Sequence, residues 1–409
     1  MFDRRLIRNW ERRLVFQRYM LFAVFLLALY FPSSIFGNIS VPVQMLGYSI
    51  CILFCMGYAI LNRMVVIYTN ICIGIFLIFL LLFFTLISYL AGVGIVTIGA
   101  LMPYVGFIVV LSLDLRSQRA IREYGHSFLV ALVGLLVLAW GVIGAEPSIT
   151  NFQSSWYQAF YDGLFEGLVV WYVKPVTVFA THSFAAFVYF LFTITCYELY
   201  SASTSRLSQL LFLAYSVTFC VLILLLLSTS AFFLTIILLG YLSLKLYSRY
   251  GGIVFAGLFV AATVSLFVYL NIASVSSQVL FDLYQGFSGS GSGFSARFGA
   301  ENRQYETYKF MFEDFNFPIG LIYNENLVLG DNFVAEYVIR VSLFGYIAVL
   351  MMLYNFLRIN VRSRLHRILI FTTVVLSDLG YPLLVTFRFV FLLPYVVLLL
   401  NGTVRQTRQ

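Results

Sequence analysis

Three charged residues, Arg340, Asp378 and Arg388, lie inside apolar stretches near the C-terminus of this chain. Charges are expensive within a hydrocarbon layer, so they usually mark a functional site there. Hydropathy places all three toward the same side of a membrane. Because a guanidinium group presents a fixed fork of donors to phosphate oxygens, this set favours a diphosphate-bearing substrate. The alternative is a buried Asp378–Arg388 ion pair that only joins two helices.

Further cations are expected at the same depth. Arg297 and Arg303 stand in a long polar stretch, and Lys174 precedes an apolar run. A Gly/Ser run, 286–293, opens this polar stretch and predicts a flexible hinge of the kind that lids use. Together with Arg340 and Arg388, these residues are the candidate diphosphate-binding groups.

Proton-transfer candidates on this side are few, and we select Asp331, Glu336 and His182 as the catalytic set. Glu336 and Arg340 are four residues apart on a predicted helix and can pair directly, which is also the alternative to catalysis for Glu336. His182 is expected about two turns into its helix. A single His on an apolar helix is more often a packing residue, so both interpretations of His182 stay open.

Composition defines the class of protein. The 409 residues are 62% hydrophobic and only 10% charged, against about 25% charged in ordinary soluble domains. Apolar runs of about 20 residues recur along the chain, as spanning helices require. We therefore expect an all-α, polytopic membrane protein. Most of the Arg falls in short loops, where topology explains it, so nucleic acid is not an expected partner. No phosphate-binding loop, dinucleotide fingerprint or His/Cys cluster is present, and we expect no cofactor and no metal.

Twelve spans follow from the hydropathy pattern and from the positions of Lys and Arg, with both termini on the cytoplasmic side. A basic N-terminus, 1–18, precedes spans one to five in 19–145. An outer amphipathic segment, 146–175, leads to spans six to nine in 176–271. The large outer loop is 272–332, spans ten to twelve occupy 333–401, and a cytoplasmic tail follows at 402–409.

Several short patterns resemble the bacterial O-antigen polymerase (Wzy-type) and O-antigen ligase superfamily of integral membrane glycosyltransferases. The stretch 331–336, Asp-Asn-Phe-Val-Ala-Glu, followed by Gly345, is similar to the family's His-Asn-x-x-Leu-Glu segment and later Gly. Asp331 stands where the family has His. Arg297 with 318–320, the entry at Lys174-Pro175, and Leu-Ser-Thr-Ser at 227–230 are similar to other family segments, although Ala231 replaces an Arg.

The resemblance implies an enzyme of the bacterial inner membrane that works on its periplasmic face. Its substrate would be an undecaprenyl-diphosphate-linked oligosaccharide, and its activity would be polysaccharide polymerisation in lipopolysaccharide biosynthesis. Loss of the loop His disfavours a ligase, which stays an alternative together with a lipid-linked oligosaccharide flippase or transporter. Membrane lipids and a chain-length regulator protein are the other expected partners.

Overall fold

The computed structural model describes the following residues of the chain: 19–30, 41–61, 66–90, 98–116, 123–144, 175, 177, 179, 182–226, 229–250, 337–378, 383–384 and 387–406. Within these residues the fold is helical, apart from an isolated bridge between Val66 and Leu113. This agrees with the expected all-α class. Residues 251–271, the last part of the stretch expected to hold spans six to nine, and the large outer loop lie outside the described residues.

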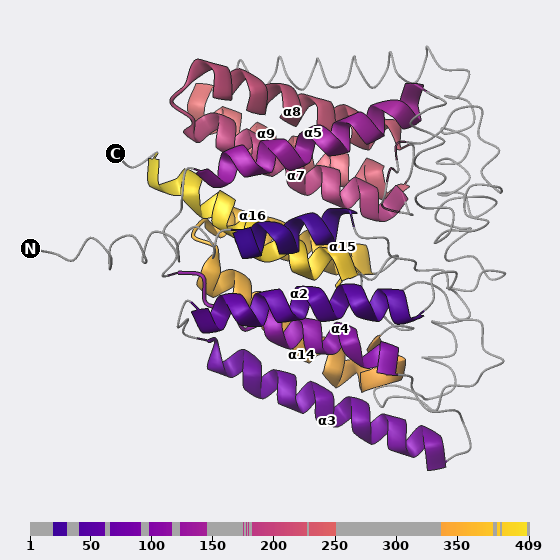
Figure 1. The fold of residues 1–409 in the computed structure, drawn as a ribbon. Helices are drawn as coiled ribbons and strands as arrows, with labels where there is room; N and C mark the ends of the chain where they lie inside the picture. Colours follow the sequence, from indigo (N-terminus) through magenta and orange to yellow (C-terminus); the bar gives the residue numbers. More distant parts are fainter. Residues whose placement is uncertain are drawn as a thin grey trace, which may run out of the picture.

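Short connections join the helices wherever the described residues continue from one helix to the next. After a first helix, Tyr19–Tyr30, they are α2 (Val41–Leu61), α3 (Tyr68–Leu90), α4 (Ile98–Leu111), α5 (Glu123–Gly144), α7 (His182–Ala202), α8 (Arg206–Leu225), α9 (Thr229–Tyr250), α14 (Ile339–Asn360), α15 (Arg364–Asp378) and α16 (Phe387–Gln406). Figure 1 shows them side by side, with α16 in the middle of the view and α3 and α8 at opposite margins.

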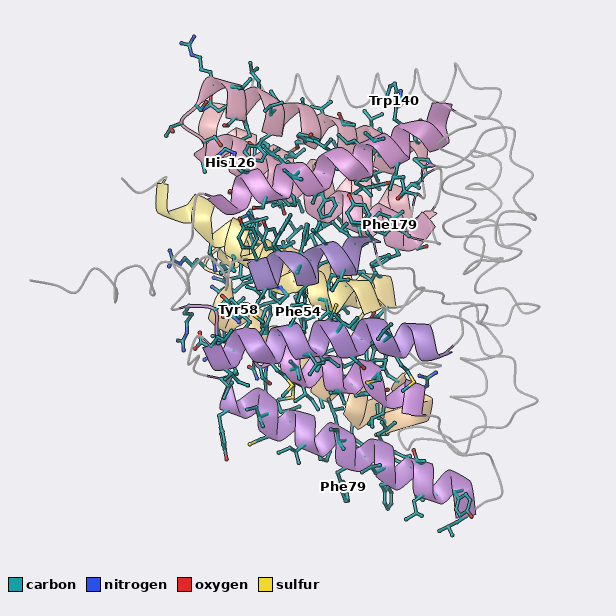
Figure 2. All side chains as sticks on the ribbon, viewed as in Figure 1. Phe54, Tyr58, Phe79, His126, Trp140 and Phe179 are labelled. Carbon is teal, nitrogen blue, oxygen red and sulfur yellow. The ribbon has the colours of Figure 1, made fainter. Side chains whose placement is uncertain are left out.

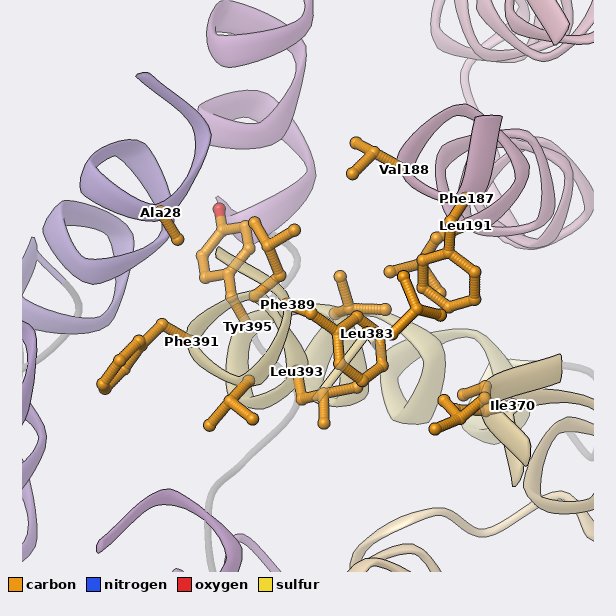
Figure 3. Packing of buried hydrophobic residues seen from close by; sticks show 14 of the residues in the cluster. Ala28, Phe187, Val188, Leu191, Ile370, Leu383, Phe389, Phe391, Leu393 and Tyr395 are labelled. Carbon is orange, nitrogen blue, oxygen red and sulfur yellow. The ribbon is translucent and has the colours of Figure 1, made fainter. Parts of the chain in front are cut away.

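Two helices form the centre of the bundle because they are apolar on every side, which is typical of a buried helix. In α7 every residue from Ser183 to Cys196 is buried, and in α16 the same holds from Phe389 to Asn401. The two helices pack directly, and the rings of Phe187 and Phe389 meet edge to face with centroids 4.9 Å apart. Figure 3 shows side chains of α7, α15 and α16 meeting in this region.

The outer helices expose large apolar side chains. Phe79 of α3 and Trp140 of α5 point away from the bundle (Figure 2), and they are 61% and 73% exposed. An apolar surface of this extent is unfavourable in water and favourable against lipid tails. Four helices in the described part of the chain are long and apolar enough to cross a membrane, namely 68–87, 183–202, 206–225 and 340–360. The fold is therefore that of a helical membrane protein, while the count of twelve spans stays a prediction.

A network of buried Asn side chains, the amide network, joins elements that are distant in sequence. Asn70 of α3 donates to the backbone carbonyls of Leu111 (2.6 Å) and Met352 (2.9 Å). Asn360, at the end of α14, donates to the carbonyl of Leu113 (2.8 Å) and accepts from the amide of Leu115 (2.7 Å).

Two further Asn residues complete the amide network. Asn401 of α16 donates to the carbonyl of Asn360 at 2.6 Å and accepts from the amide of Arg362 at 3.1 Å. Asn355 donates to the side-chain oxygen of Asn70 at 3.2 Å. Most of these bonds satisfy backbone groups at or just beyond the ends of α4 and α14, where the helix itself cannot, and together they fix α3, α4, α14 and α16 relative to one another.

Candidate functional site

The bundle has two chemically different ends. The basic end is formed by the end of α14, the start of α15 and the loop after α4, and it carries Arg116, Arg358, Arg362 and Arg364. There Arg116 pairs with Asp114 at 2.6 Å. Burial raises the pKa of the Asp114 carboxyl, but the hydrogen bonds and charge of Arg116 outweigh burial and hold this pKa below its ordinary value. The clustering of Arg at one end is the pattern that the positive-inside rule predicts for cytoplasmic loops.

The opposite end, which we call the Asp378 end, is formed by the starts of α7, α14 and α16 and by the end of α15. Asp378 is fully buried. One carboxylate oxygen accepts the hydroxyl of Tyr346 from α14 at 3.2 Å, and the other accepts the amide of Leu383 at 3.0 Å. Leu383 precedes α16 by four residues, so one carboxylate ties α14 to the chain that enters α16.

Arg340 and Arg388 stand on the two elements that Asp378 joins. Arg340 is half-buried and lies in the first turn of α14, six residues before Tyr346. Arg388 is the second residue of α16. Its side chain lies outside the described residues, so the Asp378–Arg388 ion pair stays a prediction. Three helix ends that carry the predicted charges are therefore gathered at one end of the bundle.

The start of α14 departs from a regular helix. Ser342 has φ 65° and ψ 172°, a region that residues other than glycine rarely adopt. This residue is buried, and its hydroxyl accepts the backbone amide of Phe344 at 3.2 Å. Before the break, the ring of Tyr337 packs on that of Tyr346 with centroids 5.1 Å apart. Nothing in the sequence pattern predicted this break.

His182 lies closer to its helix start than predicted. It is the first residue of α7, not two turns into a helix, since Thr177, with a positive φ of 51°, and Phe179 just before it are not helical. The chain before α7 is held by the hydroxyl of Tyr189, which donates to the carbonyl of Pro175 at 2.6 Å. Ser183 and Ser230 share a hydrogen bond of 3.1 Å, which joins the starts of α7 and α9. The side chain of His182 itself is not among those described.

The remaining predicted site residues lie outside the described part of the chain. They are Asp331, Glu336, Arg297, Arg303 and Lys174. Their roles stay predictions, and so does the pairing of Glu336 with Arg340. Of the predicted set, the structure gives a side-chain environment for Asp378 and an exposure for Arg340.

Sequence reasoning missed a buried polar cluster at the basic end, which we call the Glu198 cluster. One oxygen of Glu198 on α7 accepts from Lys245 of α9 at 2.7 Å and lies 3.1 Å from Nε2 of His366 on α15. The hydroxyl of Tyr241 donates to the same oxygen and lies 3.0 Å from Nε2 of His366. The signal was available, because Glu198 is an acidic residue inside an apolar run.

The Glu198 cluster joins α15 to the α7–α9 pair. Glu198 and His366 are both buried, whereas Lys245 keeps part of its side chain exposed. Nδ1 of His366 is buried with no hydrogen-bond partner among the described residues. The helix α15 ends at Asp378 and begins beside His366. The Glu198 cluster therefore attaches the start of α15 to α7 at the centre of the bundle.

Comparison with known proteins gives no assignment, because the chain matches no protein-family model, no curated protein and no solved structure.

Proposed function

We propose that this protein is a polysaccharide polymerase of the O-antigen type in a bacterial inner membrane, acting at the periplasmic face. The observation that carries the proposal is the junction at Asp378, where a buried carboxylate joins the two helix starts that bear Arg340 and Arg388. Arginines kept at one depth in a membrane suit a diphosphate. The local resemblance of 331–336 to the polymerase and ligase superfamily supplies the reaction class.

The reaction transfers the growing glycan from its lipid carrier to an incoming lipid-linked repeat. A hydroxyl of the incoming repeat attacks the anomeric carbon, so a new C–O bond forms while the bond from that carbon to the diphosphate oxygen breaks. Undecaprenyl diphosphate leaves with the bonding electrons. Fixed cations stabilise charge that develops in a water-poor site, and this is the role of Arg340 and Arg388, supported by Arg297, Arg303 and Lys174. Asp331, Glu336 or His182 accepts the hydroxyl proton.

One observation favours a second candidate, a lipid-linked oligosaccharide flippase. A transporter needs ionisable groups along its path, and the Glu198 cluster places a carboxylate, an amine and an imidazole inside the bundle at the end away from Asp378. The polymerase proposal gives this cluster a structural role. The two candidates therefore differ in what the Glu198 cluster does.

The decisive experiment uses purified protein in liposomes with undecaprenyl-diphosphate-linked repeats. A polymerase converts them to a ladder of longer chains without nucleotide and without an ion gradient. Movement of unaltered repeats between leaflets, with no ladder, would replace the polymerase with the flippase. Transfer to added lipid A core, with no ladder in its absence, would identify a ligase.

A further inference from the structure

The break in α14 has a consequence for the direction in which Arg340 points. From Phe344 onward α14 exposes one stripe at helical spacing, formed by Phe344, Ile347, Met351 and Tyr354. This stripe faces lipid, since it consists of large apolar side chains on the surface of a membrane helix. Residue 340 is four positions before Phe344, so an unbroken helix would place Arg340 on the same stripe.

Arg340 does not share the exposure of that stripe. Phe344 is 56% exposed, whereas Arg340 is half-buried and its neighbours Tyr337, Val338 and Val341 are fully buried. The change of direction falls between them, at the positive φ of Ser342. A charged guanidinium group that faces lipid tails costs free energy, and this cost is avoided when Arg340 is turned away from the stripe.

The break in turn requires a second feature of the chain, the glycine at position 345. A Cβ added at Gly345 would lie 2.5 Å from Cβ of Val341. In a regular helix, side chains four residues apart have Cβ atoms about 5–6 Å from one another. The bend has therefore brought Val341 over position 345, and only glycine fits beneath it. Ser342 and Gly345 together build the break, one through its backbone angles and the other through its missing side chain.

We propose that Ser342 and Gly345 are positioning residues, which turn Arg340 from the lipid-facing stripe into the protein by breaking α14. This inference rests on the proposed function only where it states why Arg340 is turned, namely to face the diphosphate. The geometry itself is independent of any activity.

The test measures the surroundings of position 340 directly. A nitroxide label is placed at Arg340→Cys, in a chain whose five native cysteines are replaced by alanine. Its collision rates with oxygen, which concentrates in lipid, and with a water-soluble nickel chelate are compared with those of a label at Phe344→Cys. With Ser342 and Gly345 intact, the label at 340 should show a lower ratio of oxygen to nickel collisions than the label at 344.

Two matched backgrounds then separate the break from a general loss of structure. Ser342→Gly tolerates the positive φ and should leave the label at 340 unchanged. Ser342→Ala with Gly345→Ala disfavours the break and favours continuous helix, and should bring the ratio at 340 to that at 344. Equal ratios at 340 and 344 in the intact chain would overturn the inference, and so would an unchanged ratio at 340 in the double variant.

Activity provides the second readout. With Arg340 present, Ser342→Gly should form polymer as the unaltered chain does, and the double variant should lose polymer as Arg340→Ala does. A double variant with full polymer would overturn the positioning role. If the unaltered chain forms no polymer, the proposed function fails, yet the label still decides whether the break turns Arg340.

Discussion

The two ends of the bundle solve the problem of buried polar groups in different ways. At the basic end the amide network pairs neutral side chains with backbone groups, and Asn360 both donates to Leu113 and accepts from Leu115. At the Asp378 end an acidic side chain is fully buried, and Ser342 holds a backbone conformation that strains any residue except glycine. Satisfied neutral networks give rigidity, whereas buried acidic groups and backbone strain are concentrated at functional sites.

This difference assigns the two ends separate roles. The amide network fixes α3, α4, α14 and α16 relative to one another at the basic end. Arg340 and Arg388 lie at the opposite ends of α14 and α16, at their first turns. The Glu198 cluster is the exception at the basic end, because it is ionic as well as buried. Variants of Glu198 therefore give the sharpest test of whether the two ends have separate roles.

The largest expected effect follows from removal of either arginine at the Asp378 end. Arg340→Ala and Arg388→Ala should each abolish polymer while the protein stays folded in the membrane. Lys should restore little activity, because a point charge cannot replace a bidentate fork. Gel analysis of polymer made by membranes with matched protein amounts measures this. Full-length polymer from both Ala variants would remove the diphosphate role from this end.

The proton acceptor is expected to have the next largest effect. Asp331→Asn should slow turnover by about a hundred- to ten-thousand-fold, the usual range for loss of a general base. Single-turnover rates are compared with those of Glu336→Gln and His182→Ala, and His182→Ala should be the milder change. A near-normal Asp331→Asn enzyme beside an inactive His182→Ala enzyme would move the base to the start of α7.

Much of the fold was predictable because hydropathy alone carries the information. The stretch 19–145, where spans one to five were expected, contains the helix Tyr19–Tyr30 and the four helices α2 to α5. The position of His182 was misjudged because a positive φ at Thr177 leaves no trace in apolar periodicity. The break at Ser342 was missed for the same reason, and the role of Gly345 needs the position of Val341 in space.

The polar contacts between helices were the least predictable part. In the sequence, Asn360 and Asn401 are ordinary polar residues near helix ends. The hydrogen bond between them joins residues that are 41 positions apart. His366 stands between arginines in the sequence, but it lies buried against Glu198, 168 residues away. Such pairings depend on which helix faces pack together, and a single sequence does not contain that information. Asp378 could be selected because a charge in an apolar run is visible locally.

Removal of Glu198 should have the largest effect on stability. Glu198→Ala leaves Lys245, Tyr241 and a buried His366 without their shared acceptor, and loss of one partner of a buried ion pair costs about 3–5 kcal/mol. Part of this loss is recovered because Lys245 can reach water. Equilibrium unfolding in mixed detergent micelles gives the free energy. A loss below about 1 kcal/mol would show that the cluster does not hold α15 to α7.

The amide network should have a smaller but definite effect. Asn360→Ala orphans the carbonyl of Leu113 and the amide of Leu115, at about 1–3 kcal/mol for each buried group. Asn355→Ala is the matched control on the same helix, since it loses one long bond of 3.2 Å and should cost about 1 kcal/mol or less. Equal losses of unfolding free energy in the two variants would contradict the role of Asn360 as a clamp.

We propose that the chemistry belongs to the Asp378 end and that the basic end is structural. The most direct test of this proposal is polymer formed per folded protein by Arg340→Ala and by Glu198→Gln, assayed side by side on purified lipid-linked repeats. Glu198→Gln keeps the shape and an acceptor oxygen while it removes the charge. Glu198→Gln should give a normal ladder, and Arg340→Ala should give none. A folded Glu198→Gln protein without a ladder, beside an active Arg340→Ala protein, would contradict this proposal.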